Sequence, residues 1–300
     1  MINTVLGTIK ESEVGTTLSH EHICCYSEYL YMMSGDKYLD KERLLATAVS
    51  CLKGLKEKYG LCTFIDCTPI NIGRDIELLK KVSEQSGVNI VCSTGFYYTE
   101  EPVLYNTSES ALAEHLITDA RRVSAGIIKC AVESEEISPF SQKLLKASAA
   151  AQKELNLPIV LHTNARNKNG AKALEILLAA GVSPEAVTVG HLSDTEDTEY
   201  IKQFAKKGCF VGLDRLYERS DKEYIDQKLK AINELISAGF ADKIILSHDA
   251  LVFNGFDAVS TINEKPRFFW VFDNIISALP EDLGKKIMVD NTLSMLKCGK

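Results

Sequence analysis

Apolar side chains recur along the chain with two periods, one typical of helices and one typical of strands. Spacings of three and four residues separate Leu44, Ala48, Leu52 and Leu55. This spacing predicts a helix over 44–59, which Gly60 would end. Residues 61–66 then form a short apolar run rich in strand formers. Helix and strand therefore follow each other directly in this part of the chain.

The same alternation continues to the end of the sequence. Strands are expected over 14–22, 61–66, 88–93, 126–130, 158–162, 186–190, 208–213 and 243–247. Helices are expected over 44–59, 74–85, 109–123, 138–155, 171–180, 194–206 and 222–238, and two more over 268–278 and 281–296. The aromatic-rich stretch 24–40 is expected to be a loop long enough to be functional.

Eight strands, each followed by helical sequence, predict a parallel sheet with right-handed crossovers. At 300 residues this pattern favours a closed (β/α)8 TIM barrel, with residues 1–300 as a single domain. A doubly wound α/β sheet is the alternative. That fold usually carries a glycine-rich phosphate loop after its first strand, where this chain has His20-Glu21-His22.

Composition narrows the functional classes. The formal net charge of −7 argues against nucleic acid as a partner, because that surface needs a basic face. Neither a signal peptide nor a run of about 18 apolar residues is present, so a cytoplasmic protein without membrane contact is expected. The nine scattered cysteines predict reduced thiols rather than a disulfide framework.

Five of the six histidines fall at the predicted carboxyl ends of strands. His20 and His22 lie two apart on the first strand, so both point to one face. His162, His191 and His248 end the fifth, sixth and eighth strands. In a barrel these ends meet at one mouth, and imidazole is a common ligand of zinc and related metals, so a metal site is predicted.

Asp249 follows His248 directly, and neighbours on a strand point to opposite sides. Asp249 is therefore expected to reach the metal site and to accept a proton there, whereas His248 is expected to have a supporting or packing role. Lys129 interrupts the apolar fourth strand. Burial of an ammonium is costly, so Lys129 must reach the rim, pair with a carboxylate, or be converted into an uncharged or anionic group.

These segments resemble the phosphotriesterase family of the amidohydrolase superfamily, which includes the phosphotriesterase-like lactonases. The matching pieces are Ser19-His20-Glu21-His22, Ser93-Thr94-Gly95-Phe96-Tyr97, Ala125-Gly126-Ile127-Ile128-Lys129, Leu161-His162-Thr163, Val189-Gly190-His191-Leu192-Ser193-Asp194, Val211-Gly212-Leu213-Asp214-Arg215, Ile245-Leu246-Ser247-His248-Asp249 and Val289-Asp290-Asn291. They span nearly the whole chain in the order found in the family.

The resemblance implies a binuclear site in which His20, His22 and Asp249 hold one divalent ion and His162 and His191 hold the other. Carbon dioxide would carboxylate Lys129, whose carbamate would bridge both ions. Zinc is the default metal, with manganese, cobalt or iron as alternatives. The expected chemistry is hydrolysis by a metal-bridging hydroxide, and a homodimer is expected from the resemblance alone.

The resemblance also bears on the substrate. No histidine lies between His191 and His248, where organophosphate hydrolases of the family use one to relay a proton. Tyr97 and the pair Asp214-Arg215 instead resemble the lactonase branch, with Tyr97 and Arg215 at the reacting ring. The alternatives for these residues are a packed aromatic side chain and a structural salt bridge.

Lys265 and Arg267 in the loop 250–268 could bind a phosphate on a sugar lactone. The prediction is therefore a lactonase that favours sugar lactones or phosphorylated sugar lactones, with acyl-homoserine lactones next. An organophosphate hydrolase and a metal-stabilised binding module without turnover are the alternatives.

Overall fold

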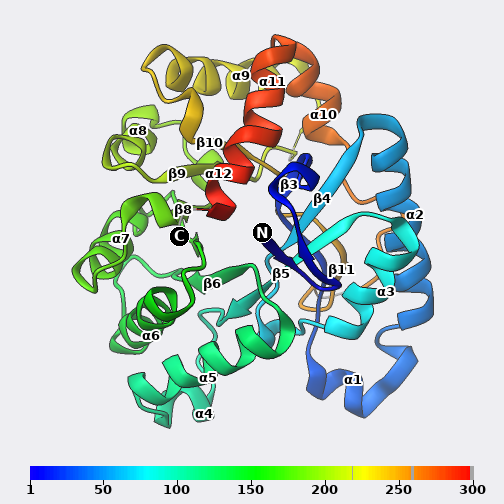
Figure 1. The fold of residues 1–300 in the computed structure, drawn as a ribbon, viewed down its shortest axis with the longest axis vertical. Coiled ribbons are helices and arrows are strands. Elements are labelled where there is room, and N and C mark those ends of the chain that lie inside the picture. The colour runs from blue at the N-terminus through cyan, green and yellow to red at the C-terminus, as the bar shows by residue number, and fades with distance from the viewer. Residues whose placement is uncertain (218, 258–259, 298–300) are drawn as a thin grey trace.

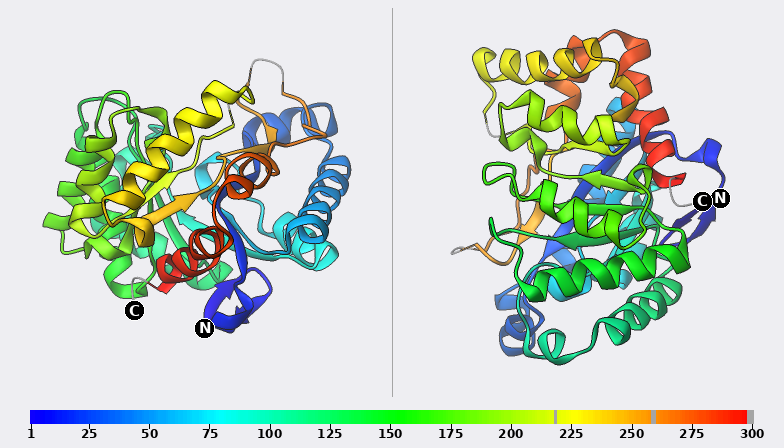
Figure 2. Two further views of the ribbon diagram at one scale, coloured as in Figure 1. Left: turned by 90° about the horizontal axis from the view of Figure 1, so that it is seen from above. Right: turned by 90° about the vertical axis from the view of Figure 1, so that its left-hand side faces the viewer.

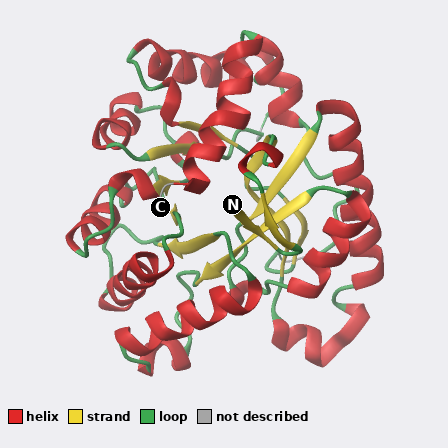
Figure 3. Cartoon of the chain, in the orientation of Figure 1, coloured by secondary structure: helices red, strands yellow, loops and turns green. Residues whose placement is uncertain are grey.

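A computed structural model describes residues 1–217, 219–257 and 260–297 of the chain. Its main sheet has nine parallel strands, which curl into a barrel surrounded by helices (Figure 1 and Figure 3). In chain order the strands are β3 (Thr16–Cys25), β4 (Leu61–Asp66), β5 (Asn89–Gly95), β6 (Ile127–Ala131), β7 (Ile159–His162), β8 (Val187–Val189), β9 (Phe210–Leu213), β10 (Ile244–Leu246) and β11 (Leu251–Asn254). This is the (β/α)8 fold predicted from the sequence.

The eighth strand of the barrel is split into two halves. β10 pairs with β9, whereas β11 pairs with β3, so the two ends of the sheet belong to one stretch of chain. Residues 247–250 connect these halves and face β3. The barrel therefore closes through a short segment that has no regular strand structure.

Helices follow the strands and form the outer ring (Figure 1 and Figure 2). They are α2 (Lys41–Tyr59), α3 (Ile76–Ser86), α5 (Glu109–Val123), α6 (Pro139–Leu155), α7 (Gly170–Ala179), α8 (Thr198–Lys207) and α9 (Lys222–Ser237), with the shorter α4 (Pro102–Asn106), α10 (Trp270–Asn274), α11 (Glu281–Lys285) and α12 (Thr292–Lys297). Side-chain caps define several starts, as where Asp40 accepts from the Arg43 amide and Ser138 from the Ser141 amide.

The amino-terminal mouth of the barrel is closed. A small hairpin, β1 (Ile2–Thr4) and β2 (Gly7–Ile9), lies there near α12, whose Lys297 forms an ion pair with Glu11 just after the hairpin (Figure 2). It is tied to the barrel by the bond from the Val5 amide to the Ile90 carbonyl. Apolar side chains inside the barrel, among them Ile65, Val160 and Phe210, fill the space above it. Any ligand must therefore enter from the carboxyl ends of the strands.

Three segments differ from the sequence prediction. The expected loop 24–40 contains a helix, α1 (Glu28–Ser34), capped by Ser27. The expected loop 250–268 contains β11, because the main-chain groups of residues 251–254 pair with β3 and complete the sheet. Residues 258–259 of this loop lie outside the described residues. The expected helix 281–296 includes a π turn over Lys286–Asn291, where the buried Asn291 amide bonds the Ala241 and Ile244 carbonyls.

Among the described residues, no helix combines the length and apolarity needed to cross a lipid bilayer.

Candidate metal centre

The six residues predicted as metal ligands come together at the carboxyl ends of the strands. His20 and His22 lie on β3, Lys129 on β6 and His162 on β7; His191 follows β8, and Asp249 lies between β10 and β11. His22 Nε2 is 3.0 Å from Asp249 Oδ1, and His20 Nε2 is 3.6 Å from the same oxygen. His20 Nε2 is also 2.6 Å from Lys129 Nζ.

Two groups of candidate ligands can be distinguished. His20, His22 and Asp249, whose ligand atoms all lie within 4.8 Å of one another, form the first candidate metal site, called the first metal site below. His162 and His191, with His162 Nδ1 and His191 Nε2 2.7 Å apart, form the second candidate, called the second metal site below. Lys129, only 1% exposed, lies beside the first site.

A single carboxylate orients a histidine of each metal site. His20 Nδ1–H donates to Asp214 Oδ2 at 2.6 Å, and His191 Nδ1–H donates to Asp214 Oδ1 at 3.0 Å. The His191 backbone amide also donates to Oδ1 at 2.7 Å. Because a carboxylate only accepts, both rings carry their proton on Nδ1 and present a bare Nε2 to the metal sites.

Two glycines make room for the Asp214 carboxylate inside the barrel. A Cβ atom at Gly212 would lie 2.9 Å from Asp214 Oδ2 and 3.1 Å from the Gly190 Cα atom. At Gly190 it would lie 3.1 Å from the same carboxylate oxygen. Any larger residue in these strands would therefore displace the carboxylate that holds His20 and His191.

The other two histidines have separate partners. His22 Nδ1 lies 2.8 Å from Thr68 Oγ1, which itself donates to the Cys24 carbonyl, so the hydroxyl accepts the ring proton. His162 Nε2–H donates to Glu133 Oε2 at 3.1 Å. Neither Thr68 nor Glu133 was predicted from the sequence, although Glu133 lies only four residues after Lys129, just beyond the end of the same strand.

These bonds fix where the ring lone pairs point. In the second metal site, His162 Nδ1 and His191 Nε2 are both unprotonated and face each other at 2.7 Å. In the first, His22 Nε2 faces a carboxylate oxygen of Asp249 at 3.0 Å. Acceptors this close require a proton or a cation between them, so this donor set fits divalent metal ions.

The electrostatics of the site agree with this. Burial, with a contribution from Lys129, lowers the pKa of His162 to about 4. Burial likewise holds the pKa of His191 well below its usual range. Burial opposes ionisation of Asp249, but the nearby His191 and Arg215 outweigh it and keep its pKa low. The pKa of His22 is raised to about 10 despite burial, by the Cys25 thiol and Asp249, so a bound cation must displace a proton there.

Both His191 and Asp249 adopt left-handed backbone conformations, with φ of 62° and 54°. Residues other than glycine rarely do so, and such positions cluster at functional sites. Asp249 and His248 point to opposite sides, as the sequence analysis expected. His248 is fully buried behind the strand, where its Nδ1–H donates to Glu21 at 2.5 Å.

A pocket of about 380 Å³ opens above the metal sites. Its lining includes the ligands His22, Lys129, His162 and Asp249, together with Cys25, Ile72, Tyr97, Tyr98, Thr99, Arg215, Leu251, Asn254 and Phe256. The Tyr97 ring stands edge-on to the His162 ring at a centroid distance of 5.1 Å. The Tyr97 amide donates to Asn71 Oδ1 at 2.7 Å, which fixes the backbone at this corner.

Arg215 lies between two carboxylates at the pocket wall. Its Nε donates to Asp249 Oδ2 at 2.7 Å and its Nη1 donates to Asp194 Oδ2 at 3.1 Å. Burial would lower the pKa of Arg215, but these two carboxylates raise it. The guanidinium therefore stays charged and holds the second oxygen of Asp249 away from the first metal site.

Three residues expected to contact substrate lie outside this pocket. Asp214 is fully buried behind the histidines. Lys265 is exposed and does not line the pocket. Arg267 lines an adjoining hollow of about 350 Å³, which shares only Leu251 and Asn254 with the pocket. Of the described lysines and arginines, only Lys129 and Arg215 line the pocket itself.

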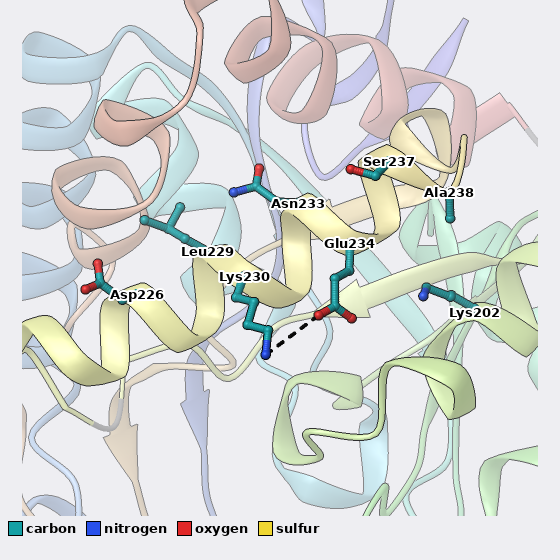
Figure 4. Close-up of a pocket in the computed structure, with 8 residues that line it drawn as sticks. All are labelled: Lys202, Asp226, Leu229, Lys230, Asn233, Glu234, Ser237 and Ala238. Atoms are coloured by element: carbon teal, nitrogen blue, oxygen red, sulfur yellow. Dashed lines mark ion pairs between the residues drawn. The ribbon is translucent and has the colours of Figure 1, made fainter.

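A larger hollow lies elsewhere on the described surface. It is an open groove of about 850 Å³ over α9, next to α8, and contains the Lys230–Glu234 ion pair (Figure 4). None of its lining residues is a metal-ligand candidate or lies at a strand end. The candidate metal ligands therefore open onto the smaller pocket at the barrel mouth and not onto this groove.

Comparisons with known proteins agree with the geometry. A family model described as the phosphotriesterase family matches residues 1–292. An aryldialkylphosphatase of Saccharolobus solfataricus is 35% identical, with 81% of this chain and 79% of that protein covered. A phosphotriesterase homology protein of Mycobacterium tuberculosis is 30% identical, covering 86% and 82%. A human N-acetyltaurine hydrolase is 26% identical, covering 83% of each chain.

Proposed function

Because the chain belongs to the phosphotriesterase family and is a hydrolase, we propose that it opens a lactone ring with the help of two divalent metal ions. His20, His22 and Asp249 would hold one ion, and His162 and His191 the other. When bound, the ions would make water acidic enough to attack at neutral pH and would polarise the carbonyl under attack. The observation that carries the proposal is the convergence of imidazole nitrogens and a carboxylate on one small volume.

Lys129 would serve as a carbamate formed with carbon dioxide. Its Nζ is buried and lies 2.6 Å from His20 Nε2, so it does not reach the rim. No ion pair joins it to a carboxylate within the described part of the chain. An unpaired ammonium here would repel cations, whereas a carbamate would supply anionic oxygen ligands to them.

Asp249 would accept the proton of the attacking water and pass it to the leaving oxygen. Arg215 bonds Asp249 Oδ2 and stays protonated at all ordinary pH, so it can position the carboxylate but cannot relay its proton. The proton would therefore go directly to the leaving group. A lactone suits this arrangement because its alkoxide is strongly basic and stays tethered within the pocket.

The pocket supports a neutral lactone more than a phosphorylated one. Tyr97, Tyr98 and Phe256 provide aromatic walls, and Arg215 is already engaged by two carboxylates. Arg267 would meet a phosphate only if the substrate extended past Leu251 and Asn254 into the adjoining hollow. Neutral sugar lactones and acyl-homoserine lactones are thus the substrates we propose first.

A pH-indicator screen of metal-loaded protein tests the proposal. Lactone opening releases a proton, so neutral sugar lactones, their phosphates, acyl-homoserine lactones and aryl phosphotriesters can be compared in one format. We expect turnover of a neutral lactone, and Asp249→Asn serves as the inactive control. Faster turnover of phosphotriesters would support the second candidate, an activity like that named for the Saccharolobus relative. Turnover of no ester would refute the proposal.

We further propose that the protein works in the cytoplasm as a homodimer. Helix α1 is without a buried residue and exposes Tyr29, Met32 and Met33, the latter two more than 80% exposed. Exposed apolar side chains of this kind are typical of protein–protein contacts. Light scattering on purified protein would distinguish the dimer from a monomer.

A further inference from the structure

The seam that closes the barrel is made largely by side chains. Between β3 and residues 246–250, the Ser19 and His20 amides donate to Ser247 Oγ at 3.1 and 3.0 Å. Only two main-chain bonds follow, from the Asp249 amide to the His20 carbonyl and from the His22 amide to the Ala250 carbonyl, both at 3.0 Å. Between β10 and β11, side-chain hydrogen bonds therefore replace most of the main-chain bonds of a regular parallel strand pair.

Glu21 is the main side chain of this seam. It lies between His20 and His22 but points to the outer side of the strand, where it is completely buried. Its Oε1 accepts from Ser247 Oγ–H at 2.8 Å and from the His248 amide at 2.9 Å, and its Oε2 accepts from the Ala250 amide at 3.0 Å. His248 Nδ1 provides a further contact to Oε1 at 2.5 Å.

The partner of the other ring nitrogen defines the tautomer of His248. The Val271 amide donates to His248 Nε2 at 3.0 Å, so Nε2 is unprotonated and Nδ1 carries the proton. His248 is therefore a neutral donor to Glu21 and not its counter-ion. Four N–H or O–H groups thus surround one carboxylate, an arrangement that suits an acceptor with two oxygens.

Asp249 lies between His248 and Ala250, whose backbone amides both donate to Glu21. Its φ of 54° makes residues 248–250 a turn that L-residues seldom adopt, and such a turn persists only where neighbours enforce it. We propose that Glu21 is a positioning residue, which holds the backbone on both sides of Asp249 and thereby presents that carboxylate to the first metal site. The middle residue of His20-Glu21-His22 thus acts on the same site as its neighbours, from the opposite face of the strand.

This inference rests on the proposed metal-dependent function, and it predicts an asymmetric loss. Without the Glu21 carboxylate, the amides of residues 248 and 250 lose their acceptor, and the turn at Asp249 relaxes. The first metal site then loses a ligand, whereas His162 and His191 keep their own partners, Glu133 and Asp214.

The test compares Glu21→Gln with the wild type. The glutamine has nearly the same shape but replaces one acceptor oxygen with an amide that donates. We expect the first metal site to bind its ion about 10- to 100-fold more weakly, so that metal content falls from about two ions per chain towards one. We also expect amide hydrogen exchange in 247–254 to become about tenfold faster or more, with β7 unchanged. If Glu21→Gln does not fold, Ser247→Ala removes one of the four donors and should show a smaller change of the same kind.

Asp119→Asn is the matched control. It weakens another carboxylate contact, the 2.7 Å ion pair between the buried Arg74 and the partly exposed Asp119, neither of which is a candidate metal ligand. A loss of thermal stability in both variants, with both metal sites intact in Glu21→Gln, would show a purely structural role and overturn the inference. Unchanged exchange in 247–254 would also overturn it. Hydrogen exchange can be measured on metal-free protein. A wild type that binds no metal would refute the proposed function, whereas the exchange data would still test the positioning role of Glu21.

Discussion

Replacing Asp214 with asparagine should weaken the first metal site more than the second. Asparagine has a single side-chain oxygen, so it can accept hydrogen bonds from only one of the two histidines. We expect it to face His191, which offers two donors, its backbone amide and its ring Nδ1–H. The new amide group then faces His20 Nδ1, which donates to a carboxylate oxygen at 2.6 Å in the wild type. Two donors cannot face each other, so the His20 ring must move its proton to Nε2, the atom that would bind metal.

The magnitude follows from the bonds lost. A hydrogen bond to a charged group contributes about 1.5–3 kcal/mol, and its loss corresponds to about 10- to 150-fold in the metal dissociation constant of the first site. The second site keeps a neutral acceptor for His191 and should weaken by about tenfold or less. The two constants can be obtained by competition with a chelator of known affinity.

Glu133→Gln provides the mirror-image comparison. Among the candidate metal ligands Glu133 bonds His162 alone, while its other oxygen accepts from Asn164 Nδ2 at 2.7 Å. Its side chain is 40% exposed, so water can replace part of the contact. We expect a modest weakening confined to the second site. Equal constants in Asp214→Asn and the wild type, or a larger loss at the second site, would refute the assignment of His20 and His191 to different ions.

Three further predictions concern single groups at the centre. Lys129→Ala should abolish turnover, with partial recovery on adding a small carboxylic acid; an active variant with full metal content would exclude the carbamate. Asp249→Asn should reduce kcat by about 100-fold or more with the fold retained by circular dichroism, whereas wild-type turnover would show that another group accepts the proton. The metal-free protein should lose stability as pH falls from about 6.5 to 4, because the pKa of His162 is about 4 in the folded state and about 6.5 when unfolded, so the unfolded chain binds the extra proton. Melting temperatures that stay constant between pH 7 and 5 in the presence of chelator would contradict this.

The periodicity of apolar residues was sufficient to predict the fold. Most helices and strands lie within a few residues of the predicted ranges, since the interior and the helix–sheet layer both require regular apolar spacing. Segments without such a requirement were missed. Helix α1 buries none of its residues, and β11 exists because the sheet needs a closing partner for β3, a demand that local sequence does not express.

The same contrast applies to the site. The histidines could be proposed as ligands because each ends a predicted strand, and strand ends meet at one mouth. The role of Lys129 and the division of the ligands between two ions came from the resemblance to the family. Asp214 was instead expected to shape the pocket. The sequence predicts its position directly after β9 but not the direction of its buried side chain. Its true setting, between His20 and His191, depends on the space left by Gly190 and Gly212, which only the assembled barrel reveals. Lys265 and Arg267 were assigned from charge alone, and charge in a long loop carries no information about direction.

Because the eighth strand is split, the candidate metal ligands and the adjoining pocket wall come from consecutive but separate segments of the chain. Residues up to Asp249 supply the candidate ligands, whereas Leu251, Asn254 and Phe256, shortly beyond it, line one side of the pocket. Substitutions in that wall can alter which molecule fits while the hydrolytic apparatus stays intact. Such separation offers a route by which one ancestral enzyme could diversify, and relatives named aryldialkylphosphatase and N-acetyltaurine hydrolase are what that history would leave behind.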